Sequence, residues 1–251
     1  MVASEYGPST YGDRIAGRYD DFYADLDPTV AARTLAVLAK RRRVLELGIG
    51  TGRIALPLVE LGVEVHGLDA SEEMVALLGK KPGGDGIPVT IGDFADVEVE
   101  GRFGLVFIAF NTFFGLLTAE DQARCFRNVA RRLEPGGGFL IEAFVPDLAR
   151  FDRDQRVSAT RVLDFEVHLE VSKHDPASQR VDTQLVVVSL ENGVSMYPIR
   201  IRYAWPEELD AMATEAGLLL RERWSGWDRS PFSEDSAFHL SMWERPAGSA
   251  S

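Results

Sequence analysis

The stretch Arg43-Val-Leu-Glu-Leu-Gly-Ile-Gly-Thr-Gly-Arg53 decides how this chain folds. A short apolar run stops at three glycines spaced Gly48-x-Gly50-x-Gly52, and a helical apolar pattern then continues to Leu61. This order predicts a buried strand, a tight glycine turn and a helix, which together form the first half of a βαβ unit. Glycines suit such a turn because the chain bends sharply there, and because a ligand can approach backbone that carries no Cβ.

Acidic residues mark the ends of the predicted strands. Glu46 lies inside the apolar run, where a carboxylate is costly to desolvate unless it meets a donor, so a ligand donor is the natural partner. The strand from Val63 ends at Asp69, where an acid binds ribose hydroxyls in nucleotide-binding sheets, although a simple turn residue is the alternative. A third strand from Val89 ends in Asp93 and Phe94.

Strands and helices continue to alternate after this point. Phe103 to Phe110 is a strongly apolar fourth strand, a helix capped by Thr118 runs to Leu133, and Phe139 to Phe144 is a fifth strand. This alternation predicts an α/β fold with a doubly wound, Rossmann-like parallel sheet. A helix from Trp205 to Gly217 and two strands, 218–224 and 238–245, close the sheet as an antiparallel edge and bring it to seven strands.

Two segments do not follow this alternation. Aromatic and apolar residues recur at helical spacing from Tyr11 to Tyr23, which predicts an amphipathic N-terminal helix within residues 1–26. This helix either packs on the main domain or serves as a lid whose Tyr hydroxyls reach into a pocket, and the lid is the expectation taken forward. A period-two pattern from about Arg161 to Tyr203 predicts an antiparallel insertion of three or four strands within residues 148–203. The remaining ranges, 27–147 and 204–246, form the predicted core, and the polar tail after Pro246 is expected to be disordered.

The composition excludes several classes of protein. The chain has 251 residues and a net charge of -12, which argues against a nucleic-acid partner. No apolar run approaches the ~20 residues that span a bilayer, so no membrane partner is expected. The single cysteine, Cys125, fits a reducing, cytoplasmic location. The four histidines are scattered, so no metal site is predicted.

Other glycine-rich motifs fit less well. A P-loop requires Lys followed by Ser or Thr directly after its last glycine, but Arg53-Ile54 stands there. The dinucleotide fingerprint requires glycine or alanine where Arg53 stands, although Asp69 keeps an NAD-dependent oxidoreductase open as an alternative. No G-x-S-x-G motif indicates a hydrolase. A non-catalytic binding protein with the same fold is the remaining alternative.

Taken together, the motifs resemble those of class I S-adenosylmethionine-dependent methyltransferases. The resemblance rests on Glu46-x-Gly48-x-Gly50-x-Gly52, Asp69, Asp93-Phe94 and Leu133-x-Pro135-Gly136-Gly137, and it covers residues 40 to 145 well. The N-terminal Tyr11-x(7)-Tyr19-Asp20 segment and the β insertion resemble the small-molecule N-methyltransferases that tailor antibiotics and amino sugars.

The resemblance implies S-adenosylmethionine as the cofactor and assigns roles to individual residues. The glycines would pass beneath its methionine part, Glu46 would accept hydrogen bonds there, and Asp69 would hold the ribose diol. Met74 would pack on the adenine and Asp93 would accept from its amino group, while a carbonyl in 109–111 would receive the cofactor's own amino group. The implied cofactor-binding residues are Tyr19, Glu46, Gly48, Gly50, Gly52, Asp69, Ala70, Met74, Asp93, Phe94, Ala109 and Phe110.

The expected reaction is methyl transfer by in-line displacement to a small-molecule acceptor, with an amine favoured over a hydroxyl. Tyr11 and Phe114 are the predicted catalytic residues, because aromatic surroundings lower an amine's pKa and keep its lone pair free. An O-methyltransferase would instead need a base, for which His168 or His174 is the candidate. The expected partner is a small molecule, and self-association into a homo-oligomer is left open.

Overall fold

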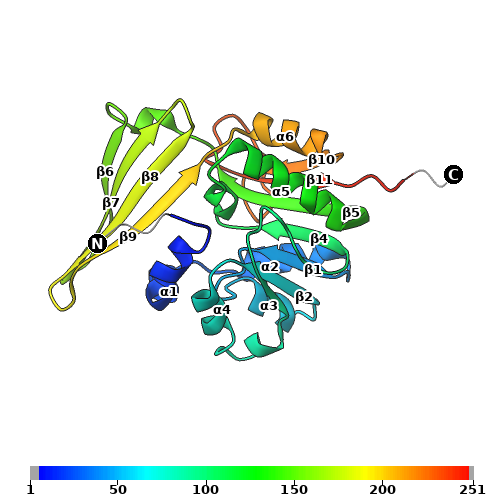
Figure 1. The fold of residues 1–251 in the computed structure, drawn as a ribbon, viewed down its shortest axis with the longest axis horizontal. Coiled ribbons are helices and arrows are strands. Elements are labelled where there is room, and N and C mark those ends of the chain that lie inside the picture. Colours follow the sequence, from blue (N-terminus) through cyan, green and yellow to red (C-terminus); the bar gives the residue numbers. More distant parts are fainter. Residues whose placement is uncertain (1–5, 249–251) are drawn as a thin grey trace.

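The computed structural model describes residues 6–248 and contains two β-sheets (Figure 1). Residues 1–5 of the predicted lid segment and 249–251 of the predicted tail lie outside the described residues. The larger sheet has seven strands in the order β10-β11-β5-β4-β1-β2-β3. Its strands are β1 (Val44–Leu47), β2 (Val65–Asp69), β3 (Val89–Ile91), β4 (Phe103–Ile108), β5 (Leu133–Phe144), β10 (Leu219–Trp224) and β11 (Phe238–Glu244).

The first five strands are parallel, and the last two form the antiparallel edge that the sequence predicts. β1 pairs in parallel with both β2 and β4, while β11 runs antiparallel to β5 and carries β10 on its outer side. This arrangement confirms the predicted doubly wound α/β fold, because the chain fills the sheet outward from β1 first on one side and then on the other.

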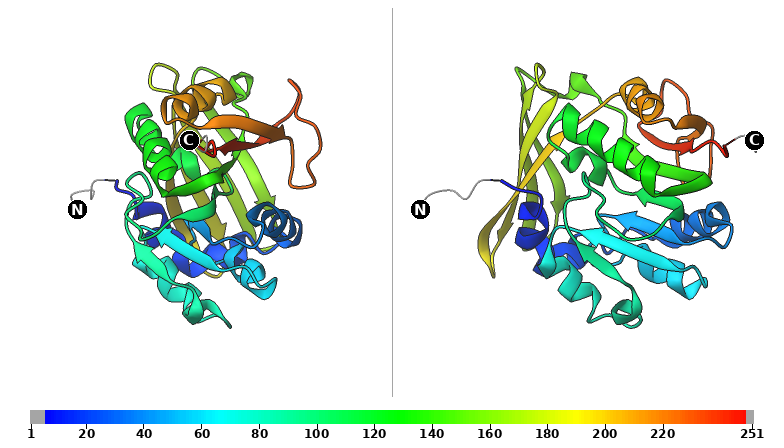
Figure 2. Two further views of the ribbon diagram at one scale, coloured as in Figure 1. Left: turned by 90° about the vertical axis from the view of Figure 1, so that its right-hand side faces the viewer. Right: turned by 45° about the vertical axis from the view of Figure 1, so that its right-hand side comes forward.

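Helices cover both faces of this sheet, as Figure 2 shows. Successive residues of β4 point to opposite faces: Leu105 and Phe107 pack with residues of α2 (Thr29–Ala39) and α3 (Ala55–Glu60), together with Leu78 of α4 (Glu72–Leu78). Val106 and Ile108 pack with residues of α5 (Ala119–Arg132) and α6 (Pro206–Glu215) on the other face. The parallel strands are therefore buried on both sides, which explains why they read as continuous apolar runs.

The predicted helix starts are largely confirmed. The Ser71 hydroxyl accepts from the backbone N–H of Met74, and the Thr118 hydroxyl accepts from that of Asp121, as N-cap residues do. α2 begins at Thr29, and the Asp27 carboxylate accepts from the N–H of that residue.

The insertion is a four-stranded antiparallel sheet of consecutive strands. These are β6 (Gln155–Val162), β7 (Glu166–Asp175), β8 (Arg180–Ser189) and β9 (Gly193–Arg202). The sheet begins six residues before the predicted position because one side of β6 carries Arg156 and Ser158 rather than apolar side chains. α1 (Thr10–Phe22) lies against this sheet, where the Phe22 ring contacts His168 and Tyr197 with centroids 5.1 and 5.5 Å away.

β5 also begins earlier than predicted, at Leu133 instead of Phe139. Leu133 pairs with Phe103, and the register then shifts so that Gly138 pairs with Leu105. Gly136 has a positive φ of 68°, and its carbonyl accepts from the Arg42 guanidinium at 3.2 Å. The glycine run therefore bends within the strand instead of separating it from the helix. Short 3-10 helices occupy three connections: η1 (Gly84–Gly86), η2 (Thr112–Gly115) and η3 (Leu148–Arg150).

Candidate active site

The carboxyl ends of β1, β2 and β4 meet at one edge of the large sheet. β1 lies between the other two strands, so the chain leaves it toward β2 on one side and returns to β4 on the other. A crevice at such a reversal is where open α/β sheets bind ligands. The glycine turn, Asp69 and the segment after β4 all lie at this edge.

The glycine turn requires residues without a side chain. Gly48, Gly50 and Gly52 all have positive φ, at 75°, 54° and 79°. A Cβ on Gly48 would lie 2.6 Å from Thr112 Cγ2, and one on Gly50 would lie 3.2 Å from Met74 Cε. The turn is therefore constrained by its dihedral angles and by its neighbours, as a backbone passing close to a ligand requires.

Asp69 links the glycine turn to the start of α4. Its Oδ2 accepts from Gly50 N at 2.7 Å and its Oδ1 from Ser71 N at 2.9 Å. Burial raises the pKa of Asp69, although these backbone donors act in the opposite direction. Each oxygen keeps a further lone pair, so the carboxylate can still accept from a diol. Met74 is buried beneath Gly50 and Gly12, and Ala70 directly follows Asp69.

Glu46 is a buried carboxylate with a free acceptor. Its side chain is 5% exposed, and within residues 6–248 its Oε2 meets no hydrogen-bond donor. Burial raises the pKa of Glu46 well above its usual range, against the opposing effect of the Arg53 guanidinium. A buried acceptor without a donor is costly for a protein alone. It fits the predicted hydrogen bonds from the methionine part of S-adenosylmethionine.

The segment after β4 forms a strained but well-supported turn. Phe110 and Asn111 both have positive φ, at 56° and 63°, which is unfavourable for a phenylalanine. Glu142 of β5 stabilises this turn, because its Oε2 accepts from Phe110 N at 2.7 Å and its Oε1 from Trp227 Nε1 at 2.8 Å. Asn111 Oδ1 accepts from Phe144 N at 2.7 Å. Strain held by such contacts typically marks a functional site.

Three tyrosines of α1 and its C-terminal cap gather over this turn. The hydroxyls of Tyr11 and Tyr23 lie 3.0 Å apart, and the Tyr19 and Tyr23 rings have centroids 4.8 Å apart. Tyr23 meets the Phe110 ring edge-on at 5.0 Å, and Arg53 Cζ lies 5.2 Å from the same ring's centroid. Tyr23 was not among the predicted site residues, although its spacing of four from Tyr19 places both on one helical face.

Burial keeps these hydroxyls protonated. It raises the pKa of Tyr11 well above its usual range and that of Tyr19 to about 12, even though the Arg53 guanidinium lowers the latter. The tyrosines therefore supply neutral hydrogen-bonding groups and aromatic faces to this region at physiological pH.

α1 is attached near both of its ends to the glycine turn and to the two ends of α4. Near its start, the Ser71 hydroxyl donates to Asp13 Oδ1 at 2.7 Å. Near its end, Asp20 accepts from the Thr51 hydroxyl at 2.6 Å and pairs with Lys81 Nζ at 2.7 Å. A Cβ on Gly12 would lie 2.6 Å from Ser71 Cβ, so the helix packs closely on α4.

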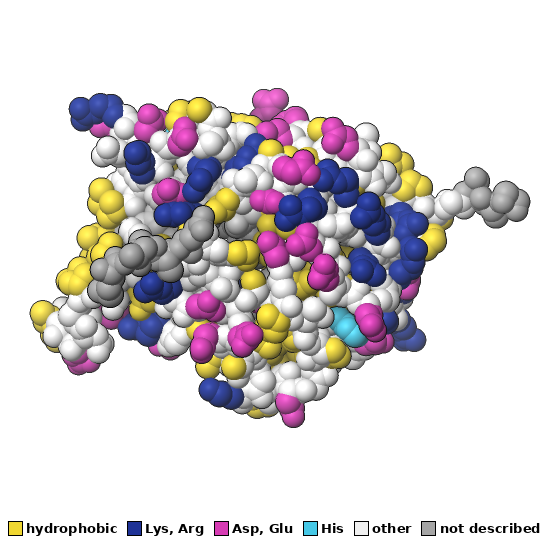
Figure 3. All heavy atoms as spheres, viewed as in Figure 1, with side chains coloured by type: hydrophobic (Ala, Val, Ile, Leu, Met, Phe, Trp, Pro, Cys, Tyr) yellow, Lys and Arg dark blue, Asp and Glu magenta, His cyan; other side chains and the backbone are white. Residues whose placement is uncertain are grey.

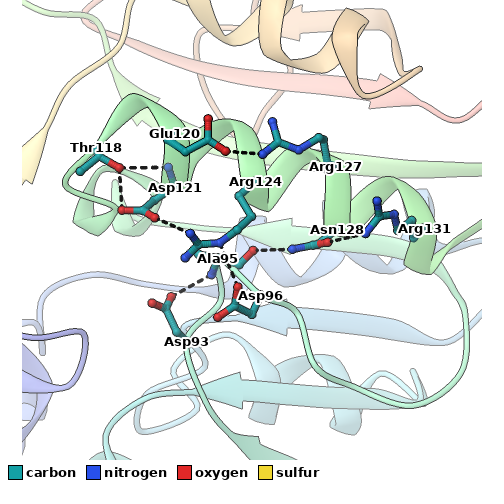
Figure 4. Close-up of polar contacts among 10 residues, drawn as sticks. All are labelled: Asp93, Ala95, Asp96, Thr118, Glu120, Asp121, Arg124, Arg127, Asn128 and Arg131. Atoms are coloured by element: carbon teal, nitrogen blue, oxygen red, sulfur yellow. Dashed lines mark hydrogen bonds and ion pairs between the residues drawn. The ribbon is translucent and has the colours of Figure 1, made fainter.

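Asp93 lies in the loop after β3, which α5 holds in place (Figure 4). Its Oδ1 accepts from Ala95 N at 2.8 Å, and the carbonyl of Ala95 accepts from Asn128 Nδ2 at 3.0 Å. Phe94 is half-buried against the core. The carbonyl of Ala109 accepts from Thr112 N at 3.2 Å and keeps a second lone pair.

Phe114 lies deeper than the other predicted residues. Its ring is 0% exposed and packs edge-on against Phe144 with centroids 5.0 Å apart. It reaches an acceptor only if η2 shifts, so its contact with substrate stays a prediction. Within residues 6–248, no group of His, Cys, Asp or Glu side chains is arranged to hold a metal ion.

The two candidate histidine bases are engaged elsewhere. His168 Nε2 lies 2.6 Å from Glu166 Oε1, and Phe22 lies against its ring. His174 Nε2 lies 3.0 Å from the Tyr203 hydroxyl, and its ring stacks on Phe151 at 4.8 Å. Both residues are 5% exposed, and the Nε2 atom of each lies within hydrogen-bond distance of a partner inside or beneath the insertion.

Comparisons with known proteins identify the family of the chain. Residues 44–137 match the family model described as "Methyltransferase domain". The structure of the CcbJ methyltransferase from Streptomyces caelestis is 41% identical, with a TM-score of 0.91, over 96% of this chain and 100% of that one. The chain therefore belongs to the S-adenosylmethionine-dependent methyltransferases, and the oxidoreductase and non-catalytic alternatives are set aside.

Two further relatives are also named as methyltransferases. Cypemycin N-terminal methyltransferase from a Streptomyces species is 28% identical over 95% of this chain and 98% of its own length. Demethylmenaquinone methyltransferase from Thermus thermophilus is 33% identical over 60% of this chain and 72% of its own. The similarity to the first of these extends across the N-terminal helix and the insertion as well as the core.

Proposed function

We propose that this methyltransferase acts on an amine of a small molecule, in the tailoring of a natural product such as an amino sugar. The observation that carries the proposal is the group of half-buried, neutral tyrosines, Tyr11, Tyr19 and Tyr23, beside the strained turn at Phe110. In such surroundings an ammonium ion loses hydration and its pKa falls, which frees the lone pair that N-methylation needs.

The surroundings of the histidines support nitrogen over oxygen as the acceptor atom. A poorly acidic hydroxyl needs a general base within hydrogen-bond reach. His168 is paired with Glu166 and His174 with Tyr203, and both are buried within or beneath the insertion. A neutral amine needs no such base at the moment of transfer.

The cofactor-binding roles remain proposals that the geometry supports. S-adenosylmethionine, when bound, supplies a methyl carbon on a positively charged sulfur that leaves readily. Glu46 would accept from its methionine part and Asp69 from its ribose, since both carboxylates retain free lone pairs. The other proposed contacts are those of Tyr19, Gly48, Gly50, Gly52, Ala70, Met74, Asp93, Phe94, Ala109 and Phe110. Tyr11 and Phe114 remain the proposed acceptor-side residues.

We further propose that residues 1–26 close the site as a lid and that 148–203 cover the acceptor, above a core of 27–147 and 204–246. The contacts of α1 with α4 and with β9 support this division. The cypemycin relative, named for an N-terminus and therefore for an amine-bearing group, supports a nitrogen acceptor. The buried free thiol of Cys125 fits a cytoplasmic location, and none of the described helices is long and apolar enough to cross a membrane.

The tip of the insertion supports self-association into a homo-oligomer. Its exposed apolar side chains include Phe165 at 67% and Leu190 at 80%, and Leu190 N donates to the Phe165 carbonyl at 3.0 Å. Figure 3 shows hydrophobic side chains along this left-hand margin of the molecule. Such a patch on a water-soluble surface favours a protein partner.

Mass-shift screening tests the proposed acceptor class. The purified chain and S-adenosylmethionine are incubated with matched amines and phenols, including amino sugars and amino acid derivatives, and the products are identified by mass spectrometry. Methyl gain at nitrogen is the expected result, and a reaction without the protein is the control. Methylation of phenols alone, with all amines unchanged, would replace the proposal with an O-methyltransferase.

A further inference from the structure

An open hollow of ≈ 570 Å³ lies where the chain enters the insertion. It is lined by Arg150, Asp152, Arg153, Gln155, Arg156 and Val157, from the end of η3 and the start of β6. No predicted site residue contributes to it. Its three arginines are notable in a chain with 39 acidic and 27 basic residues, because an acidic protein has ample carboxylates to neutralise them.

Two of these arginines lack an acidic partner. Within residues 6–248, neither Arg150 nor Arg156 lies within ion-pair distance of a carboxylate, and Arg156 donates only to the Ser158 hydroxyl at 3.2 Å. Arg153 differs, because it lies 3.5 Å from Asp152 and its side chain is 90% exposed. Guanidinium groups without internal partners are well suited to bind a carboxylate or phosphate through paired N–H donors.

Aromatic packing fixes Arg150 next to the edge of the large sheet. Its Cζ lies 5.8 Å from the centroid of Phe144, the last residue of β5, and 5.2 Å from that of Phe151. The Phe144 ring packs in turn on Phe114, and the backbone N–H of Phe144 donates a hydrogen bond to Asn111 Oδ1 in the strained turn. The hollow therefore borders the region where the acceptor is proposed to bind.

Glu170 provides a second connection between the hollow and the tyrosines. It stands on β7 opposite Ser158, the residue that accepts from Arg156. Burial raises the pKa of Tyr23, and the Glu170 carboxylate adds to that effect. Burial lowers the pKa of Arg150 most, and the positive charge of Arg156 lowers it further. The carboxylates of Glu170 and Asp147 act in the opposite direction. A carboxylate of β7 therefore lies near both Tyr23 and Arg150.

We propose that Arg150 and Arg156 bind an anionic group of the acceptor, a carboxylate or a phosphate, and so select amines that also carry a negative charge. This inference rests on the proposed N-methylation. Glu170, on β7 opposite Ser158, complements it, because a carboxylate beside the arginines attracts the amino end of such an acceptor. The anionic end then binds at the hollow.

Paired acceptors test this selectivity. Initial rates are compared for alanine against alaninamide and for glucosamine 6-phosphate against glucosamine, so that each pair differs in its anionic group. The expected kcat/KM is roughly tenfold or more higher for the anionic member, and the preferred pair identifies carboxylate or phosphate as the group recognised. The double variant R150Q/R156Q should lose this preference while keeping the rate of the neutral member. R33Q, on the exposed side of α2, is the control for lost charge.

Binding of inorganic phosphate separates this inference from the proposed function. Phosphate is titrated into the full-length protein while the Nε–H signals of its arginines are followed by NMR. Shifts at Arg150 and Arg156 that vanish in the double variant are expected, whether or not any acceptor is turned over. Equal rates within both pairs would overturn the anion site and leave N-methylation standing. Absence of any shift at these two arginines would overturn it as well.

Discussion

Two carboxylates at neighbouring strand ends have different surroundings. Burial raises the pKa of both Glu46 and Asp69, but Asp69 receives two backbone N–H donors whereas Glu46 Oε2 receives none. Asp69 therefore fixes the glycine turn to α4, and in the proposed site it would also bind the ribose. Glu46 costs the ligand-free protein free energy, and a bound donor would recover that cost.

Asp69→Ala tests the proposed ribose contact. We expect binding of S-adenosylhomocysteine to weaken by ~1.5–3 kcal/mol, because charge-assisted hydrogen bonds are lost together with the support of Gly50 N. Isothermal titration calorimetry measures the change, and Asp85→Asn on exposed η1 is the control. Unchanged affinity in Asp69→Ala would refute the assignment.

Glu46→Gln tests the cost of the buried carboxylate through its pH dependence. The folded pKa lies above the unfolded one, so the contribution of Glu46 to stability is complete below about pH 4.3 and is lost as pH rises through the folded value. The unfolding free energy of the variant minus that of the wild type should therefore grow from about pH 5 to about pH 8, by ~1–3 kcal/mol. Urea denaturation without cofactor measures it.

The control for this experiment is Glu72→Gln, on the exposed first turn of α4. Its difference from the wild type should vary little over the same range. A pH-independent difference for Glu46→Gln would contradict the assignment of a raised pKa to this carboxyl.

At the scale of elements, the position of α1 decides whether the tyrosines reach the site. The helix is amphipathic, and only Ile15 and Ala16 of it are fully buried, so apolar packing alone fixes it weakly. Its polar anchors, Asp13 on Ser71 and Asp20 on Thr51 and Lys81, attach it to elements that follow the glycine turn and Asp69. Cofactor binding and lid position are thus expected to be coupled.

Asp20→Ala tests this coupling. Burial acts to raise the Asp20 pKa, but hydrogen bonds from Lys81 and Thr51 outweigh it and hold the pKa below its usual value. The Asp20 side chain is 52% exposed, so after solvent screening we expect a loss of only ~0.5–1 kcal/mol of stability. We expect a several-fold higher KM for S-adenosylmethionine and faster hydrogen exchange across residues 10–22. Asp21→Ala, at a more exposed position of the same helix, should change neither.

At the scale of the whole molecule, the inner side of the insertion differs from its tip in the side chains that it carries. Its inner side carries Glu170, His168 and the hydroxyls of Ser172 and Thr183, which lie 2.8 Å apart. Its tip carries the exposed apolar side chains of Val162, Leu163, Phe165, Leu190 and Val194. On this inner side the polar groups alternate with the buried Val181, Leu185 and Val187 of β8, so it packs on the rest of the protein, whereas an apolar tip suits contact with another protein surface.

Phe165→Ser combined with Leu190→Ser tests self-association through the tip. The double change removes two of the most exposed apolar side chains, so we expect a smaller species by light scattering after size exclusion and little change in unfolding temperature. Val37→Ser, at an exposed apolar position of α2, is the control. A wild-type chain that is already monomeric at high concentration would contradict the proposed homo-oligomer.

Much of the fold, and the glycine turn of the candidate site, could be predicted from local sequence. Strand, turn and helix from Val44 to Leu61 follow from apolar periodicity and from glycines with positive φ, and both depend on nearest neighbours along the chain. The parallel order follows because alternating strands and helices admit few topologies. The start of β6 was missed because Arg156 and Ser158 hide its period, and the start of β5 because glycines normally break a strand.

The sequence by itself determined the class of fold, the glycine turn and the carboxylates at the strand ends, because these depend on local dihedral preference and periodicity. Only the tertiary structure decided which distant groups meet: Glu142 with Phe110 and Trp227, Tyr11 with Tyr23, and Arg150 with Phe144. It also placed Phe114 in the core and paired both histidines. The physical reason is that such contacts depend on how finished elements pack, and spacing along the chain carries no record of packing between remote segments.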